Sequence, residues 1–202
     1  MVNLQSGAGS KLRHFATLPL RIMLNVYEAK REFTAMGCHM AAWLYLDEAF
    51  AAEPLAYVET HFLKEEARLT RFDPSSELMR LNARPDRWVK VSDELWELVQ
   101  TGLELKLLTN GCFDVTLLNE IVSAGYDQPF EMIKGVQHHT HISKVKKFSA
   151  DGILFHPREQ MVWLPAGTQL DLGGIAKGYT AQVARDFLHK FGPCLKIGRA
   201  HV

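Results

Sequence analysis

The sequence predicts an α+β fold, in which helices and strands are mixed without a regular strand–helix alternation. Apolar residues recur at helical spacing in several segments, while other segments are rich in β-branched and aromatic residues. The strands do not alternate one by one with the helices, as a doubly wound α/β fold would require. With 202 residues, of which 47% are hydrophobic and 23% charged, the chain can bury one core. We therefore expect one domain.

The N-terminal half predicts strands followed by a long helix. Residues 33–46, FTAMGCHMAAWLYL, mix β-branched, aromatic and small apolar residues, which is typical of one or two buried strands. Residues 50–69 then change to helical spacing, with charged side chains opposite an apolar stripe. The stripe consists of Leu55, Val58, Phe62 and Leu69.

Two further helices are indicated by their capping residues. Ser76 follows an Asp-Pro-Ser turn and precedes helix-forming residues, so it predicts a short capped helix. Ser92 is a good N-cap, and Asp93 and Glu94 suit the positive end of the helix dipole. We expect this second helix to run to Gly111, which can adopt the left-handed C′ conformation.

The C-terminal third predicts strands and a final helix. The segments GILFHP and MVWLP flank a short polar connection, and TQLDL follows, so we expect a hairpin or meander over residues 151–172. A last helix is indicated by apolar residues at four-residue spacing, and Gly192 and Pro193 end it. The spaced residues are Ile175, Tyr179, Val183 and Phe187.

Charge and composition exclude several classes of protein. The 23 basic residues are balanced by 23 acidic ones, so no global field attracts nucleic acid. No stretch of about 18 apolar residues indicates a membrane span. Neither a signal-peptide cleavage site nor a lipid-accepting cysteine follows the N-terminal apolar patch, which favours a cytoplasmic protein. Three isolated cysteines fit a reducing compartment, and we expect Cys38 and Cys112 to be small buried hydrophobes.

The strongest local signal for a binding site is the segment Asp171–Gly178, DLGGIAKG, where a strand end turns into a helix. Glycines allow a ligand close to the backbone, and a helix N-terminus favours an anion. Lys177 adds a point charge, so the segment suggests a phosphate cradle, with Asp171 suited to a ligand hydroxyl, ring nitrogen or metal-bound water. A plain Gly-Gly turn with a surface lysine, and Asp171 as a helix cap, is the structural alternative.

Two other loops carry candidate residues. In Gly111–Thr116, Asp114 could accept hydrogen bonds from a ligand, although for this stretch taken alone capping of the next segment is the favoured interpretation. Residues 70–82, TRFDPSSELMRLN, by themselves predict only a turn and a short helix.

Taken in order, these segments resemble the FAD:protein FMN transferase family, the ApbE-type flavin transferases. The similarity includes Ala35-Met36-Gly37, the aromatic-x-x-x-Ser-Glu-Leu-x-x-Leu-Asn pattern of residues 72–82, Gly-x-Phe-Asp at 111–114 and the segment 171–179. It covers about residues 33–195. Residues 125–127, GYD, and 130–131, FE, also look like a segment of some soluble members.

The resemblance implies a set of functional residues. Lys177 and Asp171 are expected to be catalytic, and the carbonyl of Gly174 would help to hold Mg²⁺. Phe72 stands where the family usually has tyrosine, and would pack on the isoalloxazine without a hydroxyl contact. The residues expected to contact FAD are Met36, Phe72, Cys112, Phe113, Asp114, Asp171 and Lys177.

The implied reaction is Mg²⁺-dependent transfer of FMN from FAD to a threonine hydroxyl of an acceptor flavoprotein, with release of AMP. Phosphoryl transfer depends mainly on positioning and charge neutralisation, which a lysine and helix amides can supply. The alternative is a non-catalytic carrier or sensor that only binds FAD or another nucleotide. The family also includes membrane-anchored periplasmic lipoproteins.

The resemblance also predicts the domain organisation. We expect an N-terminal extension at residues 1–32 and a partial, C-terminally truncated transferase domain at 33–195. Residues 196–202, KIGRAHV, are what a common short-read sequencing adapter would encode, so we expect this segment to be foreign to the natural protein. Two positions depart from the family: Cys38 replaces a small hydroxyl residue, and Gln182 stands where aspartate is common.

The histidines at 138, 139 and 141 raise a separate hypothesis, because alternate residues of a strand share a face and imidazole binds Zn²⁺. A solvated loop is the favoured interpretation, since no nearby residue completes a set of four ligands.

Overall fold

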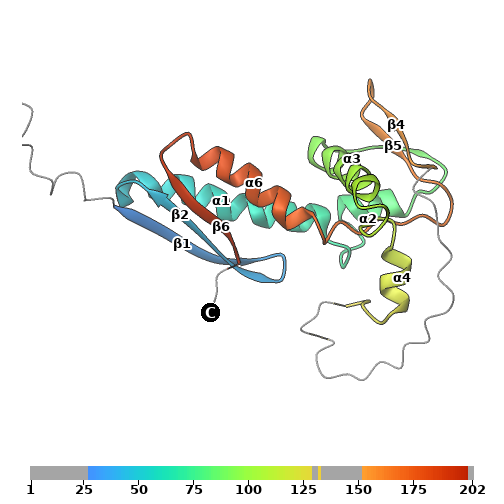
Figure 1. Ribbon diagram of the computed structural model, residues 1–202, viewed down its shortest axis with the longest axis horizontal. Coiled ribbons are helices and arrows are strands. Elements are labelled where there is room, and N and C mark those ends of the chain that lie inside the picture. Colours follow the sequence, from blue (N-terminus) through green and yellow to red (C-terminus); the bar gives the residue numbers. More distant parts are fainter. Residues whose placement is uncertain (1–26, 129–131, 133–151, 200–202) are drawn as a thin grey trace, which may run out of the picture.

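The computed structural model describes residues 27–128, 132 and 152–199. Two small antiparallel sheets and several helices make up this part of the chain, which confirms the predicted α+β class. One sheet has the strand order β1-β2-β6, and the other has the order β3-β5-β4. Figure 1 shows the first sheet with α1 and α6 beside it, and the second sheet with α2 and α3 at the other end of the molecule.

The first sheet is built on a tight hairpin. Strands β1 (Glu28–Ala35) and β2 (Cys38–Tyr45) pair along their whole length and are joined by Met36 and Gly37. Both turn residues have positive φ, 52° and 66°, as a two-residue hairpin turn of type I′ requires. The strand β1 begins within residues 1–32, which the sequence assigned to an N-terminal extension.

Strand β6 (Cys194–Arg199) completes this sheet by pairing antiparallel with β2. Its backbone therefore extends into residues 196–202, the segment expected to be foreign to the protein. Because backbone hydrogen bonding accepts almost any sequence, this pairing does not test that origin.

Helices α1 (Glu48–Leu69) and α6 (Ala176–Leu188) cover the first sheet and lie side by side (Figure 1). The apolar stripe predicted for residues 50–69 faces inward, because its four members are all buried. Leu55, Val58 and Phe62 pack in one core with residues of both hairpin strands and of α6, among them Phe33, Leu44, Ala184 and Leu188. Leu69, in the last turn of the helix, packs in a second core. The predicted N-terminal strands and both long helices are thus confirmed.

The second core lies among α2 (Glu77–Asn82), α3 (Asp93–Leu108) and the small sheet. Strands β4 (Leu154–His156) and β5 (Met161–Trp163) form the predicted hairpin. The third strand, β3 (Trp88–Lys90), pairs with β5, whereas the TQLDL segment makes only a single bridge between Gln169 and Leu117. Its expected role as a strand of the meander was therefore wrong. Leu117 itself directly precedes a short helix, α4 (Leu118–Ser123).

Capping explains where α3 begins and ends. The Ser92 hydroxyl accepts a hydrogen bond from the amide of Leu95, as predicted for an N-cap. At the other end, Asn110 has φ of 50° and its amide donates to Leu107, while the amide of Gly111 donates to Lys106. This is a Schellman motif with Asn110 at C′ and Gly111 one residue later, so the expected C′ position was off by one.

Among the described residues, none of the helices is both long and apolar enough to cross a membrane.

Candidate functional site

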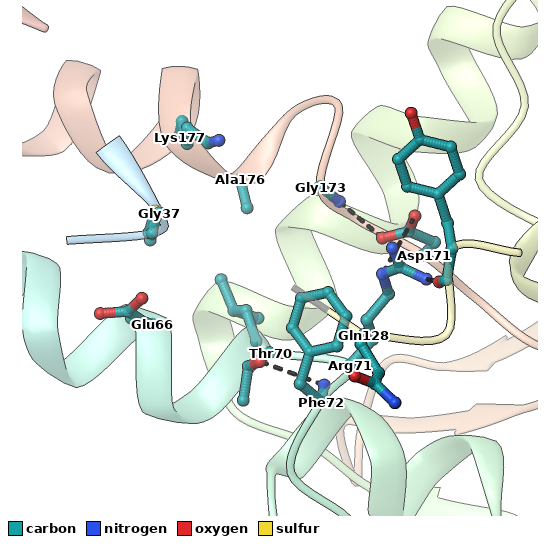
Figure 2. Close-up of a pocket in the computed structure, with 13 residues that line it drawn as sticks. Gly37, Glu66, Thr70, Arg71, Phe72, Gln128, Asp171, Gly173, Ala176 and Lys177 are labelled. Carbon is teal, nitrogen blue, oxygen red and sulfur yellow. Dashed lines mark hydrogen bonds and ion pairs between the residues drawn. The ribbon is translucent and has the colours of Figure 1, made fainter. Parts of the chain in front are cut away.

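A cavity of about 390 Å³ lies between the part of the molecule that contains the first sheet and the part that contains the second core. Its walls come from the turn between β1 and β2, the C-terminal turn of α1, the loop after α1, the segment after α4 and the N-terminal turn of α6 (Figure 2). Its size falls in the range of small-molecule sites. Four of the residues predicted from the sequence line it: Met36, Phe72, Asp171 and Lys177.

The hairpin turn places Met36 at the cavity. A left-handed conformation is unusual for methionine, and the two-residue connection imposes it on Met36. Gly37 follows at the cavity wall. The side chain of Met36 is partly buried against the first core, so it is held in place by packing.

The loop after α1 supplies an aromatic ring and a cation. The Phe72 side chain is 44% exposed although it is large and apolar, as expected for a residue that lines a binding cavity. The guanidinium carbon of Arg71 lies 4.5 Å from the centre of the Phe72 ring, a cation–π arrangement. Thr70 orders this loop, because its hydroxyl accepts a hydrogen bond from the Phe72 amide.

Asp171 is held from both its backbone and its side chain. Its amide donates to the carbonyl of Val115 at 2.8 Å, and its Oδ1 accepts from the amide of Gly173 at 2.9 Å. The other carboxylate oxygen lies 4.0 Å from Nε of Arg71, so the two opposite charges face each other at the cavity wall. Asp171 does not cap α6, whose N-cap is Ile175. Its carboxylate instead accepts the hydrogen bond of a local turn from Gly173 and lines the cavity.

The N-terminus of α6 presents donors and a cation, as the phosphate-cradle hypothesis expects. Ala176 already donates to Leu172, but the amides of Gly174, Lys177 and Gly178 have no backbone acceptor among the described residues. Such unpaired N–H groups, with the positive end of the helix dipole, favour an anion. The amino group of Lys177 lies 3.6 Å from Sγ of Cys38, which brings it over the hairpin turn.

Packing gives the reason for a glycine at 174. A Cβ atom at this position would lie 2.9 Å from Cε2 of Phe113, closer than such contacts occur in proteins. The Phe113 ring therefore packs directly against the backbone of the turn. Phe113 itself is partly buried against the second core and does not line the cavity.

Cys112 and Asp114 also lie outside the cavity lining. Cys112 is exposed in the turn after α3, which contradicts its expected burial, because the Schellman motif directs the chain toward solvent there. Asp114 accepts hydrogen bonds from the amide and hydroxyl of Thr116 and pairs with Lys106 at 2.6 Å. Burial alone would raise the pKa of Asp114, but these partners together hold it below its ordinary value. The contacts of Asp114 with Thr116 therefore agree with the alternative in which Asp114 caps the next segment.

The cavity also includes residues to which the sequence analysis gave no role, among them Glu66, Arg71, Tyr126 and Gln128. Tyr126 belongs to the GYD segment, which resembles a segment of some soluble members of the family but was given no function in the sequence analysis. Arg71 is adjacent to Phe72, which is a signal that could have identified it. Residues 130–131 and the three histidines between 138 and 141 lie outside the described residues.

The described residues contain no cluster of three or more His, Cys, Asp or Glu side chains placed to hold a metal. Asp171 faces Arg71 instead of a second carboxylate. The Gly174 carbonyl alone does not make a Mg²⁺ site, because Mg²⁺ prefers octahedral oxygen coordination with carboxylate ligands. The part of the chain that the structure describes therefore does not fit a complete Mg²⁺ site.

Similar solved structures share this fold. The ApbE protein of Thermotoga maritima is 22% identical, with a TM-score of 0.69 over 85% of this chain and 57% of that one. Flavin transferase ApbE of Vibrio cholerae is 16% identical, with a TM-score of 0.64 over 81% and 54%. Pseudomonas stutzeri flavinyl transferase ApbE is 21% identical, with a TM-score of 0.62 over 82% and 54%.

The chain thus spans a little over half the length of these structures. No curated protein matches the sequence at a significant level. A model of the ApbE family, however, matches residues 36–194, which is most of the chain and, apart from Ala35, includes the motifs on which the predicted resemblance depends. The protein belongs to the ApbE family.

Proposed function

We propose that the full-length protein transfers FMN from FAD to a threonine hydroxyl of an acceptor flavoprotein and releases AMP. One observation carries this proposal: a single cavity collects Met36, Phe72, Asp171 and Lys177, which come from three motifs far apart in the sequence. The similar structures from Vibrio cholerae and Pseudomonas stutzeri are flavin transferases as well.

The chemistry is a phosphoryl transfer. The threonine oxygen forms a bond to the FMN-side phosphorus of FAD, the bond from that phosphorus to the oxygen of the AMP group breaks, and the hydroxyl proton is released. The enzyme must mainly position the two reactants and neutralise the charge of the pyrophosphate. No covalent enzyme intermediate is needed.

The residues of the cavity divide this task. Lys177 and the unpaired amides at the start of α6 would bind the pyrophosphate oxygens, because they are donors at the positive end of a helix. Phe72 would pack on the flavin ring. Asp171, fixed by Gly173 and Arg71, would accept a hydrogen bond from the ligand or from a water molecule.

Mg²⁺ dependence is part of the proposal, and when bound the ion would add charge neutralisation at the phosphates. Apart from the carbonyl of Gly174, its ligands would have to come from outside the described residues.

The direct test incubates the full-length protein with FAD, Mg²⁺ and a threonine-containing acceptor peptide. We expect AMP release, a gain of the FMN mass on the peptide, and loss of both with a chelator. FAD binding without transfer would favour the alternative, a carrier or sensor. Absence of FAD binding would refute both.

Lys177→Ala tests the phosphate cradle. We expect FAD affinity to fall by about tenfold or more, because a charged hydrogen bond contributes roughly 1.5–3 kcal/mol and 1.4 kcal/mol is a factor of ten. Titration calorimetry measures this change. Lys190→Ala, just beyond the C-terminal end of the same helix, is the control, and an equal effect of both substitutions would contradict the assignment.

A further inference from the structure

The outer face of the second sheet carries a row of large apolar side chains. In the register of the strands, Trp88 of β3 lies opposite Trp163 of β5, and Trp163 lies opposite Leu154 of β4. Residues at the same register position point to the same face of a sheet, so these three form one row across it. Trp88 is 44% exposed and Leu154 is 50% exposed. Figure 1 shows this sheet at the end of the molecule opposite the first sheet.

The inner face of the same sheet is fully packed. Val89 and Val162 are buried in the second core, and the Phe155 ring lies 5.0 Å from the Trp96 ring of α3. The core-facing positions of the strands are therefore the ones that alternate with the exposed row. The solvated face of an antiparallel sheet is normally polar. An apolar row on that face indicates an interaction surface.

The loop before β3 adds positive charge beside this row. An open hollow lies there, and the residues that line it are Ala83, Arg84, Pro85, Arg87 and Trp88. Arg84 and Arg87 are exposed, and neither forms an ion pair with another residue in the described part of the chain. Lys90 is also exposed and lies on the same face of β3 as Trp88. The hollow therefore presents cations beside an aromatic ring.

The backbone of this loop is held in place although the loop is exposed. The Asp86 amide donates to the carbonyl of Leu164 at 2.8 Å, and Oδ1 of Asp86 accepts from the amide of Ala166 at 3.1 Å. The acidic residue of the loop is thus used to attach it to the segment after β5. The cations on either side of Asp86 project from a fixed backbone, which lowers the entropy cost of binding a partner.

We propose that this face is a docking surface for an acidic segment of a partner protein that also carries apolar side chains. The docking surface consists of Arg84, Arg87, Trp88, Lys90, Leu154 and Trp163. Its cations complement carboxylates, and its apolar row suits leucine or aromatic side chains. Tryptophan and arginine are also the residue types that dominate the binding energy of protein interfaces.

The hollow favours a protein partner over a lipid bilayer. Side chains that enter a bilayer must protrude from the protein, whereas Trp88 and the two arginines line a hollow that can receive a side chain of a partner. The docking surface shares no residue with the cavity between the two cores. The inference therefore does not depend on flavin transfer.

The test measures binding of a short fluorescent peptide of glutamate and leucine residues to the full-length protein by anisotropy. We expect binding that weakens as the salt concentration rises, because salt screens the attraction between exposed charges. A peptide with lysine in place of glutamate should not bind. A peptide with serine in place of leucine should bind about fivefold more weakly or worse, because it has no apolar side chains to bury.

The role of charge is tested by reversing it at two positions. Arg84→Glu combined with Arg87→Glu should raise the Kd of the acidic peptide by about tenfold or more, because like charges would then meet. Arg185→Glu combined with Lys190→Glu is the matched control. It changes the net charge equally, and both residues are exposed and lie outside the docking surface.

The role of the apolar row is tested at Leu154. Leu154→Ser should raise the Kd of the peptide by about fivefold, because a leucine side chain is no longer buried on binding. Leu108→Ser is the control, because Leu108 is an exposed leucine at the C-terminal end of α3, and it should not change the Kd. Thermal unfolding without peptide shows whether each variant is folded.

Each outcome decides the proposal. Wild-type protein that does not bind the glutamate–leucine peptide overturns it, and so do control variants that weaken binding as much as the surface variants. Tighter binding to phosphatidylglycerol vesicles or to a single-stranded oligonucleotide than to the peptide would also overturn it, because the surface would then serve a membrane or a nucleic acid. FAD binding and FMN transfer are measured separately, so failure of this proposal leaves the proposed function standing.

Discussion

Asn82 is buried, with 2% of its surface exposed, and both ends of its side-chain amide pair with the backbone of Leu170. Its Nδ2 donates to the Leu170 carbonyl at 2.9 Å, and its Oδ1 accepts from the Leu170 amide at 2.8 Å. Leu170 directly precedes Asp171, so this pair of bonds fixes the position of the cavity carboxylate. The final residue of the Ser-Glu-Leu-x-x-Leu-Asn pattern thus acts on the site through the backbone, 88 residues away.

Asn82→Ala should destabilise the protein strongly, because the buried N–H and C=O of Leu170 lose their partners. At about 1–3 kcal/mol for each of the two unsatisfied groups, we expect a loss of roughly 2–6 kcal/mol, measured by urea unfolding. Asn119→Ala is the control, because Asn119 also donates to a backbone carbonyl, that of Gly167, but at the surface. Similar losses in the two variants would contradict the structural role of Asn82.

At the scale of elements, the start of α6 combines two glycines with opposite surroundings. Gly174 lies under the Phe113 ring, whereas a Cβ at Gly178 would meet nothing within 4 Å. The first glycine is needed for packing between the turn and the segment after α3. The second lies in an exposed helical turn, where glycine costs stability relative to alanine.

We expect Gly174→Ala to cost about 1–3 kcal/mol through overpacking and to displace the turn after Asp171. Gly178→Ala should stabilise the helix by up to about 1 kcal/mol. Thermal and denaturant unfolding measure both effects. Adding Phe113→Leu to Gly174→Ala should restore part of the lost stability. A double variant that is no more stable than Gly174→Ala would contradict the packing of Phe113 against Gly174.

At the scale of the whole molecule, a buried ionic network joins three helices. Glu65 of α1 has no exposed surface, and Nη1 of Arg68 lies 3.1 Å from its Oε1. Arg68 also pairs with Glu94 of α3 and lies 3.5 Å from Glu77 of α2. One arginine therefore faces three carboxylates where the elements around the cavity meet.

The network predicts a dependence of stability on pH. Burial raises the pKa of Glu65 above its ordinary value, despite Arg68. Folding therefore favours protonated Glu65, and its contribution to stability is present below the ordinary pKa and is lost as pH rises through the raised one. Glu65→Gln mimics the protonated form. We expect it to gain stability relative to wild type as pH increases from about 4 to 8.

Glu94→Gln is the opposite control. Burial alone would raise the pKa of Glu94, but the hydrogen bond and charge of Arg68 outweigh burial and lower it. Its contribution is present above the ordinary pKa and is lost as pH falls through the lowered one. Glu94→Gln should therefore be destabilising at neutral pH and less so in acid. Denaturant unfolding across pH measures both variants, and the same pH trend for the two would contradict the interpretation.

The sequence by itself predicted the α+β class, the main helices, the β4–β5 hairpin and the family. These features depend on local periodicity, on capping residues such as Ser76 and Ser92, and on the order of motifs along the chain. The C-terminal end of α3 was misplaced by one residue because asparagine and glycine both adopt the left-handed conformation there.

Only the tertiary structure decided which of the candidate residues share a cavity. Arg71 and Tyr126 meet across 55 residues, and Lys177 reaches Cys38 across 139, distances along the chain at which no periodicity carries information. Cys112 and Asp114 belong to a motif of the family, yet they lie outside the cavity because local capping directs them elsewhere. Side-chain placement depends on packing between segments, and that packing exists only in the folded chain.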